Sequence, residues 1–159
     1  MMINPAITAR VAELKARDTE VREHEMAHFQ AAGALALSGP MITDYVVGPD
    51  GEMYADGGHV MINTAETGDP REDVRRGEII TIAAEAPLGV GSELSGADLV
   101  VADKGRAMVT KSRHLLSKLD QLKATLGGQG SQIPQGRLAT MAASLGLDLP
   151  PGRILSLIA

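Results

Sequence analysis

The sequence predicts an α+β fold that is mainly helical: a long N-terminal helix, a small antiparallel β-hairpin or meander, and two further helices. Apolar residues recur at steps of three, four and seven over the first 35 residues and again over residues 98–126. Strand-forming residues bounded by Gly and Pro lie between these stretches. Only 2% of the 159 residues are aromatic, so the core is expected to consist of aliphatic side chains and methionine.

The first helix is predicted to begin at Asn4-Pro5, because Asn is a good N-cap and Pro fits the first helical position. Helical spacing of apolar residues continues as far as Leu35. A second cap at Asp18-Thr19 leaves open whether this is one helix or two. Gly39-Pro40 is expected to end it.

Residues 41–62 are predicted to form the hairpin or meander. Residues 42–47 favour a strand, and Gly48-Pro49-Asp50-Gly51 is typical of a turn. Residues 52–55 can return as the partner strand, and residues 59–62 can continue it after two glycines.

Two helices are predicted beyond the strands. Asp69-Pro70 opens the first and Pro87 stops it. Ser95 or Asp98 starts the second, which reaches Leu126. Apolar residues seven apart along this helix indicate either core packing or a seam for a partner helix, and the second interpretation would support a homo-oligomer.

The domain prediction divides the chain after Leu126. Residues 1–126 are expected to form a compact domain, and residues 127–159 a Gly-rich linker with an apolar C-terminal tail. The linker is the glycine-rich stretch 127–130, and the tail is expected to hold one short helix over residues 137–145.

Composition excludes several classes of protein and of site. The net charge is −5 and no run of Lys or Arg offers a basic face, which argues against nucleic-acid binding. Absence of cysteine excludes disulfides and thiolate metal sites. No apolar run is long enough to cross a bilayer, and the first ten residues lack a signal pattern, so we expect a cytoplasmic protein without a membrane partner.

The segment His24-Glu25-Met26-Ala27-His28 has the form H-E-x-x-H. On a helix, residues four apart share one face, so both imidazoles can bind one zinc ion. Glu25 can act there as the general base that takes a proton from a zinc-bound water. The motif predicts a minimal zincin-like domain with Zn²⁺ as cofactor. Two surface histidines on a charged helix are the alternative interpretation.

Such a site needs a third protein ligand. The extended motif H-E-x-x-H-x-x-G-x-x-H would need Gly and His at positions that are Ala31 and Ala34, so the third ligand must lie beyond the helix. We predict His59, which lies between two glycines and an apolar strand. The alternatives are three later acidic residues: Glu93, Glu85 and Glu78.

The chain resembles the SprA-related family of bacterial metallopeptidases. The resemblance extends from Leu14 to about Ala107 and is carried by these segments: residues 14–18 and 20–22 leading into His24–His28, Gly48–Gly51 with Tyr54, Gly57-Gly58 and Val60, Gly68-Asp69-Pro70, and Ala86-Pro87 with Glu93, Ser95 and Asp98. It implies a zinc-dependent peptidase. The family pattern has Glu after the Gly-Gly pair, where this chain has His59, and both residues can bind zinc.

The predicted function is therefore that of a zinc metalloendopeptidase, which hydrolyses a peptide or protein substrate with metal-activated water. Two alternatives remain at this point. The chain is a non-catalytic metal-binding module, or it is a helix-mediated interaction and assembly protein in which the H-E-x-x-H motif is vestigial.

Overall fold

The computed structural model describes residues 4–127 and 132–159 and confirms the α+β, mainly helical class. The helices and strands in chain order are α1 (Pro5–Ala32), β1 (Met41–Val47), β2 (Met53–His59), α2 (Pro70–Glu85), α3 (Gly96–Leu126), α4 (Gln135–Ser144) and α5 (Pro151–Ile158). Two short 3-10 helices are η1 (Gly33–Leu35) and η2 (Ala86–Val90). No helix in the described part of the chain is both long and apolar enough to cross a lipid bilayer.

Helix α1 is a single uninterrupted helix. The Asn4 side chain accepts a hydrogen bond from the Ala6 amide and Pro5 occupies the first turn, as predicted. The expected end at Gly39-Pro40 is wrong, because α1 already ends at Ala32. Gly33 follows with a φ of 51°, a conformation that glycine adopts easily, and its amide donates to the Phe29 carbonyl.

The strands form a two-stranded antiparallel hairpin in the described residues, not a three-stranded meander. The predicted turn is confirmed, with the Gly51 amide donating to the Gly48 carbonyl at 3.0 Å. Gly57 and Gly58 lie inside β2, which ends at His59. Beyond it, Ile62 makes only an isolated bridge to Ala36.

Two compact units divide the chain: unit 1 comprises Met1–Ala65 and Arg76–Arg106, and unit 2 comprises Glu66–Arg75 and Ala107–Ala159. Helices α2 and α3 contribute residues to both units. This division interleaves the sequence, whereas the predicted boundary after Leu126 separates two consecutive segments and stays a prediction. Most of the predicted Gly-rich linker, residues 128–130, lies outside the described residues.

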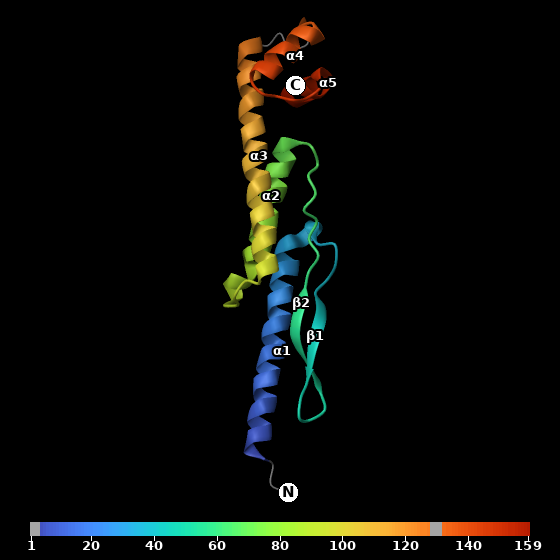
Figure 1. The fold of residues 1–159 in the computed structure, drawn as a ribbon, viewed down its shortest axis with the longest axis vertical. Coiled ribbons are helices and arrows are strands. Elements are labelled where there is room, and N and C mark those ends of the chain that lie inside the picture. The colour runs from blue at the N-terminus through green and yellow to red at the C-terminus, as the bar shows by residue number, and fades with distance from the viewer. Residues whose placement is uncertain (1–3, 128–131) are drawn as a thin grey trace. The chain divides into compact units, whose positions relative to one another are not determined.

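In unit 1, strand β2 and η2 pack against α1, and Figure 1 shows the hairpin running alongside that helix. Asp18 accepts a hydrogen bond from the Ala55 amide at 2.8 Å, which ties β2 to the side of α1. Helices α2 and α3 approach closely at Gly105, where a Cβ atom would lie 2.7 Å from the Gly77 carbonyl oxygen. These contacts fix the elements that surround the motif.

In unit 2, the predicted apolar tail forms two helices, α4 and α5, that pack against the C-terminal half of α3. Their aliphatic side chains form one cluster with Leu119, Leu122 and Leu126. Part of the heptad pattern of α3 is therefore used for core packing within the chain. A homo-oligomer through α3 stays a prediction.

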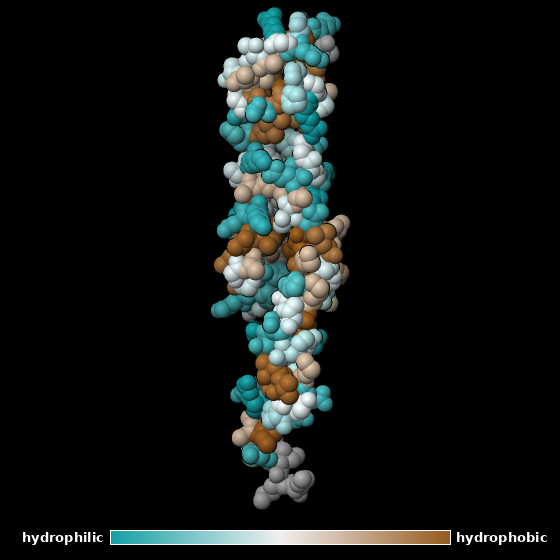
Figure 2. Space-filling view, turned by 45° about the vertical axis from the view of Figure 1, so that its right-hand side comes forward, coloured by the Kyte–Doolittle hydropathy of each residue, from teal (hydrophilic) through white to brown (hydrophobic). Residues whose placement is uncertain are grey.

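Large apolar side chains also remain exposed in unit 1, including Ile82, Leu88 and Val100. On the face drawn in Figure 2, hydrophobic residues form separate patches with hydrophilic residues between them. Scattered exposed apolar residues are usual for folded proteins and indicate no particular partner.

Candidate metal centre

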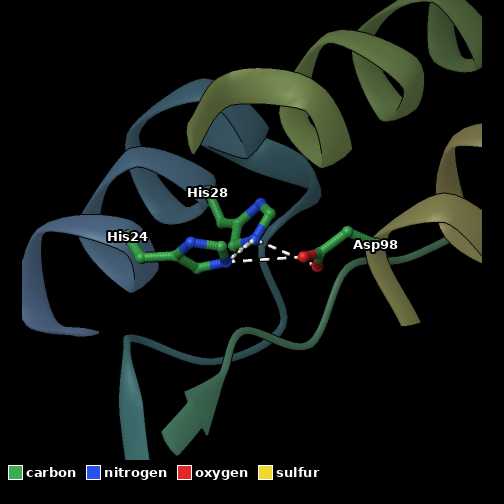
Figure 3. A group of neighbouring side chains, drawn as sticks. All are labelled: His24, His28 and Asp98. Carbon is green, nitrogen blue, oxygen red and sulfur yellow. Dashed lines mark hydrogen bonds and ion pairs between the residues drawn. The ribbon is translucent and has the colours of Figure 1, made fainter. Parts of the chain in front are cut away.

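The two histidines of the motif point in the same direction from consecutive turns of α1 (Figure 3). Their Nε2 atoms lie 3.1 Å apart. His28 is buried, with 4% of its surface exposed, and His24 is half-buried. The spacing of four residues on a helix accounts for this convergence.

The third member of the group is Asp98, in the first turn of α3. Its Oδ1 atom lies 3.0 Å from His28 Nε2, and its Oδ2 atom lies 3.4 Å from His24 Nε2 (Figure 3). A capping box holds this carboxylate in place. The Ser95 amide donates to Asp98 Oδ2 at 2.7 Å, and the Asp98 amide donates to Ser95 Oγ at 3.2 Å.

The outer nitrogen of each imidazole is also bonded. His28 Nδ1 lies 2.8 Å from the Ala83 carbonyl oxygen of α2, which can only accept, so His28 Nδ1 carries the proton. His24 Nδ1 lies 2.8 Å from the Ser92 hydroxyl, which can accept in the same way. A proton on Nδ1 leaves the Nε2 lone pair of each ring facing the centre of the group, the arrangement common to metal-binding histidines.

Within residues 4–127 and 132–159, His24, His28 and Asp98 are the one group of three or more such side chains whose ligand atoms lie close enough to hold a metal ion. When both rings carry their proton on Nδ1, two Nε2 lone pairs and the carboxylate oxygens of Asp98 converge. Without a shared cation or proton, these acceptors would repel one another. The group can therefore hold a metal ion.

The members of the group also shift one another's pKa values. Burial acts to raise the pKa of Asp98, but its hydrogen bonds with His28 and Ser95 bring the pKa down to about 2. Burial and the neighbouring His28 lower the pKa of His24. For His28 burial acts to lower the pKa, but the bonds to Asp98 and to the Ala83 carbonyl raise it above its ordinary value. Asp98 is therefore readily anionic and His24 readily neutral. A metal ion would compete with a proton for His28.

Glu25 is buried beside the group, with 4% of its surface exposed. Its Oε2 atom makes no hydrogen bond with any of the described residues. Burial raises the pKa of Glu25, and the nearby charge of Asp98 acts in the same direction, against His28 and His59. Gly58 of β2 lies directly against it, because a Cβ atom there would lie 3.0 Å from Glu25 Cγ and 2.6 Å from the Met41 carbonyl oxygen.

A cavity of about 120 Å³ adjoins these four side chains. Its other walls are largely apolar and include Val60, Ile62 and Val101. A larger groove, with a volume of about 620 Å³, also reaches His24 and Glu25. A buried acid and a group that could hold a metal ion therefore share an accessible space with an apolar wall, which is usual for a ligand site.

The predicted third ligand, His59, lines the smaller cavity but is exposed and is not part of the three-residue group. Its role as a ligand stays a prediction. Of the alternatives, Glu93 lines the larger groove, Glu85 pairs with Arg106, and Glu78 lies outside the group.

Sequence reasoning named Asp98 as one of two possible helix starts and as part of the family resemblance, but missed it as a ligand candidate. The pattern Ser95-x-x-Asp98 is a recognisable capping box, and it indicates a helix start at this point of the chain. It gave no sign that the same carboxylate faces two histidines some 70 residues earlier in the chain, because that proximity arises from tertiary packing.

Comparison with curated proteins and with solved structures gives no match. A family model, that of the SprA-related family, matches residues 3–134, which is most of the chain and includes His24, His28 and Asp98. The chain belongs to the SprA-related family.

Proposed function

We propose that this protein is a zinc-dependent hydrolase that cleaves peptide bonds, with His24, His28 and Asp98 as zinc ligands and Glu25 as the general base. One observation carries the proposal. Three metal-ligand atoms converge beside a buried carboxylate whose Oε2 atom has no hydrogen-bond partner among the described residues. Perturbed acids and convergent ligands in one cavity are typical of active sites.

The geometry of the group supports zinc in particular. Donors bound at roughly 2.0–2.1 Å in a tetrahedron lie about 3.3 Å from one another. The two Nε2 atoms lie 3.1 Å apart, and the Asp98 carboxylate approaches His28 Nε2 with Oδ1 at 3.0 Å and His24 Nε2 with Oδ2 at 3.4 Å, which is close to that spacing. Two imidazoles and one carboxylate are ligand types that zinc accepts, and three protein ligands leave the fourth position open, as in catalytic zinc sites.

When bound, zinc would lower the pKa of a coordinated water to about 7 and polarise a substrate carbonyl. Glu25 would carry the proton from the attacking water to the leaving amine. Its free Oε2 can accept a proton from the attacking water, and its raised pKa favours holding that proton until the leaving amine takes it.

The surrounding residues would orient these groups. Ala83 and Ser92 fix the rings of His28 and His24 through their Nδ1 atoms, and Ser95 fixes Asp98. The close packing of Gly58 restricts the side chain of Glu25. The apolar wall formed by Val60, Ile62 and Val101 would limit access of bulk water.

The test compares wild-type protein with Glu25→Gln and with the control Glu23→Gln, an exposed acid on the same helix that lines neither cavity. Each protein is loaded with zinc, its metal content is measured, and cleavage of a quenched-fluorescent peptide library is followed. We expect one zinc per chain in all three proteins. Glu25→Gln should cleave about 10²–10⁴-fold more slowly, and Glu23→Gln like wild type.

Other outcomes point elsewhere. Zinc binding without cleavage by the wild type would indicate the non-catalytic metal-binding module. A stable homo-oligomer that takes up no zinc would indicate the assembly protein.

A further inference from the structure

The larger groove begins at His24 and Glu25 and extends along α1. Its volume of about 620 Å³ falls within the roughly 300–1,000 Å³ usual for ligand sites. Three of its lining residues are glycines: Gly57, Gly58 and Gly91. The groove is therefore large enough for a part of a substrate that lies beyond the bond to be cleaved.

Acidic side chains outnumber basic ones in the lining of the groove. Besides Glu25, three acidic side chains line the groove: Glu20, Asp56 and Glu93. Arg17 is the one Lys or Arg side chain among the described residues that line it. All three acids are exposed, so their carboxylates are reachable from the groove.

The hydrogen bonds of Arg17 are directed at protein groups. Its guanidinium group lies 3.2 Å from Glu20 Oε2 and 3.4 Å from Asp56 Oδ1, and it also donates to the Asp56 carbonyl at 3.3 Å. Glu93 makes no hydrogen bond or ion pair with the described residues. The groove thus offers a carboxylate with unused acceptors, whereas its cation already has partners.

A second, independent feature indicates that the groove receives a ligand. Glu25 lies in its wall with 4% of its surface exposed, and Glu25 Oε2 has no partner among the described residues. A buried polar atom without a hydrogen bond is costly in a folded protein, and such atoms are found where a substrate or solvent molecule completes the site.

We propose that this groove binds a Lys or Arg side chain of a peptide substrate, with Glu93 as the main carboxylate partner and Glu20 and Asp56 in support. The inference rests on the proposed peptidase function and names its substrate class. Ammonium and guanidinium groups donate charge-assisted hydrogen bonds to carboxylates. An acidic substrate side chain would meet an excess of like charge, because Arg17 is the one Lys or Arg side chain among three acids besides Glu25 in the lining.

Equilibrium binding tests the inference without relying on catalysis. Three fluorescein-labelled decapeptides of Ala and Ser would differ only in a central Arg, norleucine or Glu. Their affinities for the zinc-loaded wild-type protein, and for its inactive Glu25→Gln variant, are measured by fluorescence anisotropy. We expect Arg to bind about 5–10-fold more tightly than norleucine at low salt, with Glu the weakest, because exposed ion pairs contribute modestly. The preference should shrink as salt is added.

Two charge variants assign the preference to the groove. Glu93→Gln should reduce the Arg preference about threefold, and Glu23→Gln, which lies outside the groove, should leave it unchanged. Equal binding of the three peptides, tightest binding of the Glu peptide, or an Arg preference that Glu93→Gln does not reduce would each overturn the inference.

The binding result is separate from the peptidase test. If the Arg peptide binds preferentially and Glu93→Gln weakens it, but wild type cleaves no peptide, the groove assignment stands and the proposed activity falls. If wild type cleaves peptides but binds the Arg and norleucine peptides equally, the activity stands and the groove assignment falls. Thermal unfolding of Glu93→Gln confirms that the variant is folded.

Discussion

Two acidic side chains, one in each unit, are equally buried but differently bonded. Asp73 in unit 2 and Glu25 in unit 1 each expose 4% of their surface. Asp73 accepts hydrogen bonds from the Thr67 amide and hydroxyl at 2.7 Å and from the Gly68 amide at 3.2 Å. Glu25 leaves its Oε2 atom without a partner among the described residues. A buried acid with its bonds satisfied stabilises a fold, whereas an unsatisfied one costs stability and is retained where chemistry needs it.

The surroundings of Asp73 and Glu25 also differ, because one acid lies in a unit with an aliphatic cluster and the other lies beside a cavity. Asp73 lies in the unit whose helices share an aliphatic cluster around Leu122 and Ile154. Glu25 lies against two histidines, a second carboxylate and an open cavity. We therefore expect substitutions in unit 2 to change the free energy of unfolding, and substitutions around Glu25 to change metal binding and activity more than stability.

The largest effect on stability is expected for Asp73→Ala. It removes the acceptor for three hydrogen bonds that order the turn before α2, and should lower the free energy of unfolding by about 2–4 kcal/mol. Urea denaturation measures it, with Asp148→Ala, an exposed acid in the same unit, as the control expected to stay within about 0.5 kcal/mol. A loss no larger than that of the control would mean that the hydrogen bonds of Asp73 do not stabilise the fold.

Ser92→Ala should affect zinc rather than stability. The serine hydroxyl is the partner of His24 Nδ1, and loss of a hydrogen bond that orients a metal ligand usually weakens metal affinity about 10–100-fold. Zinc titration against a competing chelator measures the change. Ser144→Ala, whose hydroxyl bonds to the Met141 carbonyl in α4, serves as the control. Equal affinities of the two variants would mean that Ser92 does not position His24.

The smallest effect is a gain in stability. Burial raises the pKa of Glu25 in the folded protein above its unfolded value, so its contribution to stability is full below the unfolded pKa and is lost as the pH rises through the folded pKa. Glu25→Gln replaces the ionisable carboxyl group with a neutral amide, so the variant does not lose this stability as the pH rises. The metal-free variant should be more stable than wild type at neutral pH by about 1 kcal/mol, and the difference should vanish below about pH 4.

Calorimetry of both proteins across this pH range checks the sign. A Glu25→Gln variant that is less stable than wild type at neutral pH would show that the carboxylate makes a stabilising interaction in the folded state.

Local signals in the sequence predicted much of the fold. The Asn4 cap, the turn at Gly48–Gly51 and the start of α2 at Pro70 each depend on residues within a few positions of one another, and all three were predicted correctly. The end of α1 was misplaced, because its apolar spacing continues past Gly33 and a single glycine with positive φ overrides that pattern.

The candidate metal centre was predictable only in part, because one of its three residues comes from a distant part of the sequence. His24 and His28 are four residues apart on one helix, so their proximity follows from helix geometry. Asp98 reaches them through the packing of α3 in unit 1, which no local pattern encodes. His59 was favoured on its chemistry, and the fold places it at the cavity wall instead of in the group.

X-ray absorption spectroscopy of the zinc-loaded protein tests the central claim most directly, because it counts the imidazoles bound to the metal. Ligation by His24, His28 and Asp98 predicts one zinc per chain with two imidazole nitrogens and the remaining ligands oxygen, all at roughly 2.0–2.1 Å. Three imidazoles would mean that His59 binds the metal. That result, or a protein that binds no zinc, would contradict the assignment of Asp98.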